Sequence, residues 1–231
     1  MSLNRRQFIQ AGVLAAAGIV QATVTDAAQA AGGDITHGSR SKANVALTFH
    51  GAGDPAIATS ILKLLKSTNT PITVFAVGTW LQSYPKFAKE IIDAGHDLGN
   101  HTLHHYEMKT LTAKKVDSEI AGCASELKKL IGNHGSWFRA SGTQYTTPTI
   151  RKAALKYGYK NCISYEVDSQ DYLNPGKAAV VKNTMAGVKN GSIVSLHFGH
   201  HDTLLALPQL LEKLHGKRFT PVTITTLLGK I

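Results

Sequence analysis

The sequence predicts one α/β domain in which short parallel strands alternate with helices that cover the sheet. The chain has 231 residues, of which 43% are hydrophobic and 17% charged, and this composition supports one ordinary core and argues against disorder. Short apolar runs alternate with segments whose apolar residues recur every three or four positions, which is typical of repeated βα units. Polar residues capable of chemistry directly follow several of the apolar runs. An open doubly wound sheet and a closed barrel both fit this pattern.

About seven strands and six helices are expected after a polar leader that ends near Asn44. The strands are short apolar runs, predicted at residues 45–49, 72–77, 97–100, 136–138, 162–167, 192–197 and 222–224. The helices have amphipathic repeats and are predicted to open near Asp54-Pro55, Pro85, Thr112, Thr147-Pro148, Asn174-Pro175 and Leu204. In either architecture the carboxyl ends of the strands meet at one face, where α/β proteins carry out their chemistry.

The first thirty residues have the pattern of an export signal. Arg5-Arg6 precedes an apolar stretch over residues 11–20, and Ala28-Gln29-Ala30 matches the small-residue site that signal peptidases cut. The paired arginines resemble a twin-arginine signal, which serves proteins that are exported already folded. An ordinary secretory signal and an uncleaved N-terminal anchor are the alternatives. We therefore expect a signal peptide over residues 1–30 and a periplasmic, cell-wall associated or secreted domain over residues 31–231.

The charge balance indicates an anionic partner. Lysines and arginines number 25 against 15 aspartates and glutamates, a formal charge of +10. For an exported protein, the anionic partners within reach are cell-wall polymers and acidic polysaccharides. Nucleic acid is not expected, because no run of basic residues is interleaved with aromatic ones. An integral membrane span is not expected after signal removal either. Cys123 and Cys162 leave a disulfide open, since sequence does not place their α carbons within bonding distance.

Several side chains capable of chemistry fall at or just after the ends of predicted strands. In chain order they are His50, His101, His105, Arg139, Asp168, Asp171 and His197. Each alone is weak evidence, because with 11 histidines an i, i+4 histidine pair arises by chance in roughly half of such chains. Arg139 alone would fit an ordinary salt bridge. Their order along the chain, unit after unit, indicates a common site at one end of the sheet.

The same residues resemble motifs of the polysaccharide deacetylase family, also called NodB-homology domains or carbohydrate esterase family 4. The family's second motif, H-[ST]-x-x-H, matches His101 to His105 in full. The fourth, D-x-x-D-W, is nearly intact from Asp168 to Tyr172, and the fifth, L-x-H, is condensed to Leu196-His197. The third, R-x-P-[YFW], survives only as Arg139 followed by Ala140-Ser141-Gly142. The resemblance covers about residues 45–197.

The first motif of the family, T-F-D-D-G-P, is changed in this chain. In the family its first aspartate is the general base and its second is a metal ligand, whereas His50 and Gly51 stand at those positions here. A rebuilt site is physically reasonable, because a catalytic zinc needs three protein ligands and one open position. Asp54, which follows the loop Gly51-Ala52-Gly53, is expected as the third ligand with His50 as the base. The reverse assignment and a joint role are equally open.

The resemblance implies a distorted (β/α) barrel and a metal-dependent hydrolase of carbon–nitrogen bonds, with zinc as the expected metal. The expected substrates are N-acetyl or O-acetyl groups of a polysaccharide such as peptidoglycan or a chitin-like polymer. Metal-activated water would attack the acetyl carbon, and His197, oriented by Asp168 or Asp171, would protonate the leaving amine. The expected metal ligands are Asp54, His101 and His105, and the expected catalytic residues are His50, Arg139, Asp168 and His197.

Two other functions compete with this interpretation. An inactive protein of the same fold that binds cell-wall polysaccharide or metal is favoured by the lost aspartates. The presence of His197 argues against it, since a binding protein needs no proton donor there. Hydrolysis of an amide outside polysaccharides is the third hypothesis. Tyr172, Trp80 and Trp137 are candidates to offer a sugar an apolar face, although each also fits an ordinary core position.

Overall fold

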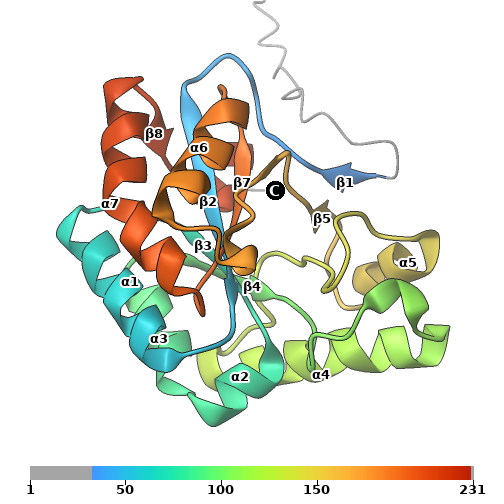
Figure 1. Ribbon diagram of the computed structural model, residues 1–231. Helices are drawn as coiled ribbons and strands as arrows, with labels where there is room; N and C mark the ends of the chain where they lie inside the picture. The colour runs from blue at the N-terminus through green and yellow to red at the C-terminus, as the bar shows by residue number, and fades with distance from the viewer. Residues whose placement is uncertain (1–32, 230–231) are drawn as a thin grey trace, which may run out of the picture.

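Strand β2 (Asn44–Gly51) is the centre of the domain and has parallel neighbours on both sides. The computed structural model describes residues 33–229, and its main sheet has the order β4-β3-β2-β7-β6, with β8 beside the start of β2 (Figure 1). The partner strands are β3 (Thr73–Ala76), β4 (Asp97–Asn100), β6 (Val167–Asp168), β7 (Ile193–His197) and β8 (Thr220–Pro221). The register places His50 of β2 opposite Phe75 and His197. The carboxyl ends of these strands are therefore level.

The sheet closes on itself through short bridges, which gives a distorted barrel. Phe138 forms single parallel bridges to Asn100 at the end of β4 and to Cys162 in β5 (Cys162–Ile163). The segment that contains β5 continues into β6, and β6 pairs with β7. The hydrogen-bonded path thus returns to the central strands. The predicted barrel of parallel strands surrounded by helices is confirmed, with its weakest closure at Phe138.

The helices form an outer layer around the strands (Figure 1). Four of them start where a side chain accepts a hydrogen bond from the first turn, at Asp54, Thr112, Thr147 and Thr223. The helices are α1 (Pro55–Ser67), α2 (Gly78–Ser83), α3 (Lys86–Asp93), α4 (Ala113–Ile131), α5 (Pro148–Lys156), α6 (Lys177–Gly187), α7 (His201–Gly216) and α8 (Ile224–Leu228). Two short 3-10 helices, η1 (Met108–Thr110) and η2 (Asp171–Leu173), follow β4 and β6.

Alternation along β2 separates the outer core from the barrel interior. Val45, Leu47 and Phe49 pack in the large core between the sheet and the helices. Ala46, on the opposite face, belongs to the smaller interior cluster, which also includes residues of α8. Thr48 and His50 continue that interior face toward the carboxyl end. The barrel interior is therefore apolar at its amino end and becomes polar where the strands finish.

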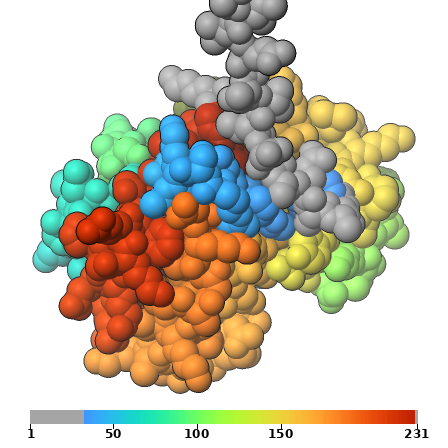
Figure 2. Space-filling view, turned by 90° about the horizontal axis from the view of Figure 1, so that it is seen from above, coloured from blue at the N-terminus to red at the C-terminus, as the bar shows by residue number. Residues whose placement is uncertain are grey.

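The N-terminal segment closes the amino end of the barrel. β1 (Asp34–Ile35) pairs in parallel with β5, and His37 bridges to Ser192. Arg40 binds Glu166 through two hydrogen bonds of 2.8 and 2.7 Å. Figure 2 shows this blue segment lying across the upper face against orange residues of the C-terminal half. This segment is thus part of the barrel, on the side away from the reactive residues.

Three predicted elements differ from the structure. The expected last strand at residues 222–224 is wrong, because Thr223 caps α8 by accepting a hydrogen bond from the backbone of Thr226; the strand there is β8, just upstream. The run at 136–138 contributes only the bridges of Phe138. The run at 162–167 is divided into β5 and β6. Each of these runs is short, and tertiary pairing decides how much of it is extended.

Two further predictions concern the export signal and the two cysteines. The predicted export signal, with Arg5-Arg6, lies outside the described residues. Within residues 33–229, no helix has both the length and the hydropathy that a membrane crossing requires.

Cys123 and Cys162 are both buried as free thiols, and burial raises the pKa of each to about 12. These thiols are therefore inert packing groups.

The contact between β1 and the segment before α5 makes a stability prediction. Asp34 is 1% exposed, and its carboxylate accepts hydrogen bonds from the Thr146 backbone N–H (2.6 Å) and hydroxyl. Asp34→Ala should lower the free energy of unfolding by about 1–3 kcal/mol, because it leaves buried donors without an acceptor. Asp93→Ala, which breaks an exposed pair with Lys89, should cost about 0.5 kcal/mol or less. Urea denaturation measures both, and equal losses would contradict the assignment.

Candidate metal-binding site

Three histidines meet at the carboxyl ends of the strands. His50 is near the end of β2, His101 directly follows β4, and His105 lies four residues further along the same loop. One ring nitrogen from each lies within 4.8 Å of those of the other two. The His50 and His101 ring centroids are 4.3 Å apart, and those of His101 and His105 are 4.9 Å apart. This spacing suits three imidazole ligands around one metal ion.

His101 carries the clearest sign that a cation fits here. Its side chain is fully buried, and its Nδ1 lies 2.9 Å from the carbonyl oxygen of Arg139. A carbonyl only accepts, so the His101 proton is on Nδ1 and the lone pair is on Nε2. That Nε2 is buried and has no hydrogen-bond partner. A buried acceptor without a donor is costly, and a metal ion at this nitrogen would satisfy it.

Arg139 contacts His50 through its guanidinium group. The Arg139 Nη1 donates to His50 Nε2 at 3.2 Å, and also to Thr48 Oγ1 at 2.8 Å. The remaining guanidinium contacts go to the carbonyl oxygens of Ile163 and Ser164. Arg139 is 2% exposed, and burial lowers its pKa to about 9, which leaves it charged at pH 7. A metal ion that took the His50 Nε2 lone pair would have to replace this arginine contact.

The three clustered imidazoles are held neutral. Burial lowers the pKa of His50 well below its usual value, and the neighbouring charges of His101, His197 and Arg139 lower it further. Burial and His105 likewise lower the pKa of His101. Burial and His197 lower the pKa of His105. Neutral imidazole is the form that binds a metal, so the cluster is ready for one near neutral pH.

Asp54 lies apart from the histidines. Its exposed carboxylate caps α1 by accepting from the Ala56 backbone N–H at 2.8 Å. The preceding loop is locked, because a Cβ at Gly53 would lie 2.5 Å from the Cα of Gly199. The loop therefore lacks the freedom that was expected to bring this carboxylate to the metal. Of the arrangements left open by the sequence, the structure brings His50 to the histidine pair and leaves Asp54 as a helix cap.

His197 completes the site with a carboxylate partner. Its ring centroid is 4.3 Å from that of His50, and its Nδ1 lies 2.7 Å from Asp171 Oδ1. Asp171 is fully buried and also accepts from the His197 backbone N–H and from Thr203. Burial alone would raise the pKa of Asp171, but these hydrogen bonds and the charge of His197 lower it, so it is a carboxylate. Its bond fixes the Nδ1 proton of His197 and leaves Nε2 free for chemistry.

Asp168 does not contact His197. Its Oδ1 accepts from the Gln170 backbone N–H at 2.9 Å, which stabilises the turn after β6. Of the two carboxylates expected to orient His197, Asp171 is thus the one that does so.

Thr48 is a further residue that sequence reasoning missed. A polar residue two positions before His50 in an apolar strand was the available signal, because both side chains lie on the interior face.

The aromatic candidates divide between core and surface. Trp80 and Trp137 are buried, and their ring N–H groups donate to the Gly53 carbonyl and the Thr225 hydroxyl, so both are structural. Tyr172 is 43% exposed, and its ring centroid is 5.4 Å from that of His197. Tyr172 is therefore the aromatic residue among the three that can meet a ligand at this site.

Comparison with known proteins matches this chain to the polysaccharide deacetylase family. The family model for polysaccharide deacetylases matches residues 37–162. A peptidoglycan-N-acetylglucosamine deacetylase of Bacillus cereus is 30% identical over 188 residues, which cover 80% of this chain and 87% of that protein. A chitooligosaccharide deacetylase of a Bradyrhizobium species is 28% identical, over 73% of this chain and 74% of its own. A family 4 pseudoenzyme from Bacillus anthracis has a similar crystal structure, with a TM-score of 0.79 and 27% identity over 85% of this chain and 69% of that one.

The neutral histidines predict how the stability of the metal-free chain depends on pH. Histidines in the unfolded chain have a pKa near 6.5. In the folded chain the pKa values of His50, His101 and His105 are lowered, so these three residues bind protons less readily. The free energy of unfolding should therefore be unaffected by these groups well above pH 6.5 and fall as the pH drops below it. His101→Asn, which keeps a side-chain N–H donor, should reduce this slope by up to about 1.4 kcal/mol per pH unit.

Urea denaturation between pH 5 and 7.5, in the presence of a chelator, measures this slope. His215→Asn, at an exposed position late in α7, is the matched control. Equal slopes for the wild type and His101→Asn would show that His101 is not held neutral by its burial.

Proposed function

Since the chain belongs to the polysaccharide deacetylase family, we propose that it is an exported metal-dependent deacetylase that hydrolyses N-acetyl or O-acetyl groups of a polysaccharide. Peptidoglycan and chitin-like polymers are the substrates that the relatives' activities suggest. The observation that carries the proposal is the meeting of three neutral imidazoles with the His197–Asp171 pair at the carboxyl ends of the strands. The signal pattern of residues 1–30 supports action outside the cytoplasm.

The metal site proposed here uses His50, His101 and His105. All three are imidazoles, a donor set that suits zinc, and zinc is the metal we propose. A divalent ion held there would supply Lewis-acid activation of water and of the acetyl carbonyl. The chain's own contribution is to orient these donors: the Arg139 carbonyl fixes His101, and the Arg139 guanidinium holds His50 in the metal-free site and would release its Nε2 to a metal ion. Arg139 thereby keeps His101 in place as a ligand and holds His50 beside it until a metal ion binds.

His197 is the residue that we assign to proton transfer. Asp171 accepts from its Nδ1–H, so a protonated His197 would carry its second proton on Nε2 and would pass that proton to the leaving amine. The partly exposed His197 is reached from solvent beside Tyr172, whose ring offers the sugar an apolar surface. The products would be acetate and a free amine. Asp168 would act only by shaping the turn that carries Asp171.

A non-catalytic polysaccharide- or metal-binding protein is the second candidate function. It is favoured by one observation in the described residues: the histidine cluster contains no carboxylate, neither Asp54 nor any replacement for the family's first-motif aspartates. The similar fold of a pseudoenzyme is consistent with it. The His197–Asp171 pair favours the enzyme, because His197 lies outside the three-histidine cluster and its carboxylate partner orients it for proton transfer. Separate measurements of metal and acetate distinguish the two.

Metal binding should depend on His101. We expect the purified domain to bind about one zinc ion, and His101→Ala to lose it, because two ligands rarely hold zinc tightly. His96→Ala is a matched control, since His96 is also a buried histidine with an unpartnered Nε2 but lies outside the cluster. Zinc stoichiometry after dialysis is the measurement. Unchanged stoichiometry in His101→Ala would exclude the assigned site.

Acetate release should depend on His197 without a matching loss of metal. His197→Gln should reduce acetate release from chitin oligomers or peptidoglycan by about 100-fold or more, as removal of a general acid does. Its zinc stoichiometry should equal that of the wild type, because His197 is not among the ligands. A wild-type protein that binds zinc but releases no acetate from either polymer would instead support the binding protein.

A further inference from the structure

The loop between β4 and η1 holds two histidines on an unfavourable backbone. Thr102 and His105 have φ angles of 69° and 62°, in the left-handed region that residues other than glycine rarely adopt. Thr102 is also β-branched, which makes the conformation less favourable still. Residues in such conformations persist only where the surrounding structure holds them. The position of His105 therefore depends on contacts made by the rest of this loop.

The first half of the loop is held by α2 and by the end of β4. The backbone N–H groups of Gly78 and Thr79, at the start of α2, donate to the carbonyls of Thr102 and Leu103, each at 2.9 Å. The Asn100 side chain accepts from the Thr102 N–H at 2.8 Å. These bonds account for the strained Thr102. They do not reach the residue next to His105.

Helix α4 holds the second half of the loop. Glu119 is fully buried, and its Oε2 accepts from the His104 backbone N–H at 2.8 Å. Its Oε1 lies 2.9 Å from His104 Nδ1 and 3.1 Å from Lys115 Nζ. One helical turn later, Gly122 makes room for Leu103, because a Cβ there would lie 2.5 Å from Leu103 Cδ2. The α4 surface is thus shaped to receive this loop.

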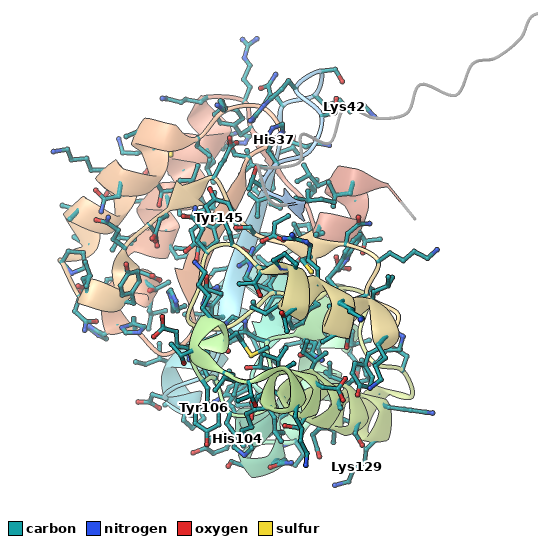
Figure 3. The ribbon with its side chains drawn as sticks, turned by 90° about the vertical axis from the view of Figure 1, so that its right-hand side faces the viewer. His37, Lys42, His104, Tyr106, Lys129 and Tyr145 are labelled. Carbon is teal, nitrogen blue, oxygen red and sulfur yellow. The ribbon has the colours of Figure 1, made fainter. Side chains whose placement is uncertain are left out.

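Glu119 is charged despite its burial. Burial acts to raise the pKa of its carboxyl, but hydrogen bonds from His104 and Lys115 outweigh that effect and lower the pKa. A buried carboxylate is expensive unless every contact is in place. Figure 3 shows His104 together with Tyr106 beside the green helix α4, and the two rings are stacked with centroids 5.3 Å apart. The loop is thus held at the residue before His105 by Glu119, and at the residue after it by Ser141, whose hydroxyl donates to the Tyr106 carbonyl at 2.6 Å.

We propose that Glu119 is a positioning residue of the metal site. It clamps His104 by backbone and side chain, and so keeps His105 in its left-handed conformation with the imidazole turned toward His101. Glu119 lies outside every motif that the chain shares with the deacetylase family, and it contacts none of the three clustered histidines. The proposal rests on the proposed metal-binding function of these histidines. It adds that metal affinity is set partly from α4.

The test compares two glutamates on one helix. Glu119→Gln keeps the size of the side chain but removes the charge and one acceptor from the His104 clamp. We expect its zinc dissociation constant to rise about tenfold or more, the usual effect of losing a residue that orients a ligand. Glu126→Gln is the matched control, because Glu126 is also buried on α4 but contacts Gln82 and Lys129. Competition with a chromogenic chelator gives the affinity, and thermal unfolding of the metal-free proteins gives their stability.

If Glu119 only stabilised the fold, Glu119→Gln and Glu126→Gln would both lose metal-free stability and both keep wild-type zinc affinity. His104→Ala is a second variant, at an exposed residue, in case Glu119→Gln does not fold. It removes the side-chain half of the clamp and should also weaken zinc binding. Wild-type affinity in both Glu119→Gln and His104→Ala overturns the proposal while leaving the proposed function intact. A wild-type protein that binds no zinc overturns both.

Discussion

The buried residue Arg139, through its guanidinium and its backbone, makes the contacts on which the rest of the site depends. Its Nη1 holds His50, its carbonyl oxygen holds His101, and its backbone N–H donates to the Asn100 carbonyl at the end of β4. One residue therefore positions His101, contacts His50 in the metal-free site and joins both to the weakest part of the barrel wall. In the described chain all its side-chain hydrogen bonds go to neutral acceptors, and the guanidinium carbon lies 4.2 Å from the centre of the Phe75 ring.

A buried cation without a carboxylate partner has a direct chemical consequence. The charge of Arg139 makes a second positive charge on His50 unfavourable and helps to keep that imidazole neutral. The Asp171 carboxylate is committed to His197 and Thr203. The site therefore separates its charges: neutral donors face the centre, and the negative charge lies behind the proton-transfer histidine. In the proposed function, this separation would let the three clustered histidines bind a cation while His197 carries a proton.

The sequence predicted the fold class and the end of the barrel where the chemistry lies, because both follow from alternation of apolar runs and helices. It did not decide between Asp168 and Asp171, which follow the same strand three residues apart. That choice is made by α7, whose Thr203 and whose approach beside His197 bury Asp171 alone. Likewise, nothing local to Asp54 shows that Gly53 is locked against Gly199, a contact between segments far apart in sequence. Glu119 was overlooked for the same reason, as its partner is in another element.

The packing at Gly51 indicates whether the first motif has been lost or rebuilt. This residue stands where the family has its second aspartate, and it pairs with Ala76 of β3. A Cβ at Gly51 would lie 2.8 Å from Val74 Cγ1 and 3.1 Å from the Cα of Ala76. A side chain at Gly51 would require Val74 and the β3 backbone to shift, so the present packing of β2 against β3 favours glycine over an aspartate. His50, on the opposite face, is the side chain that this backbone directs into the site. Close strand packing at Gly51 and an imidazole at His50 are thus one consistent arrangement, which supports a site rebuilt around histidine.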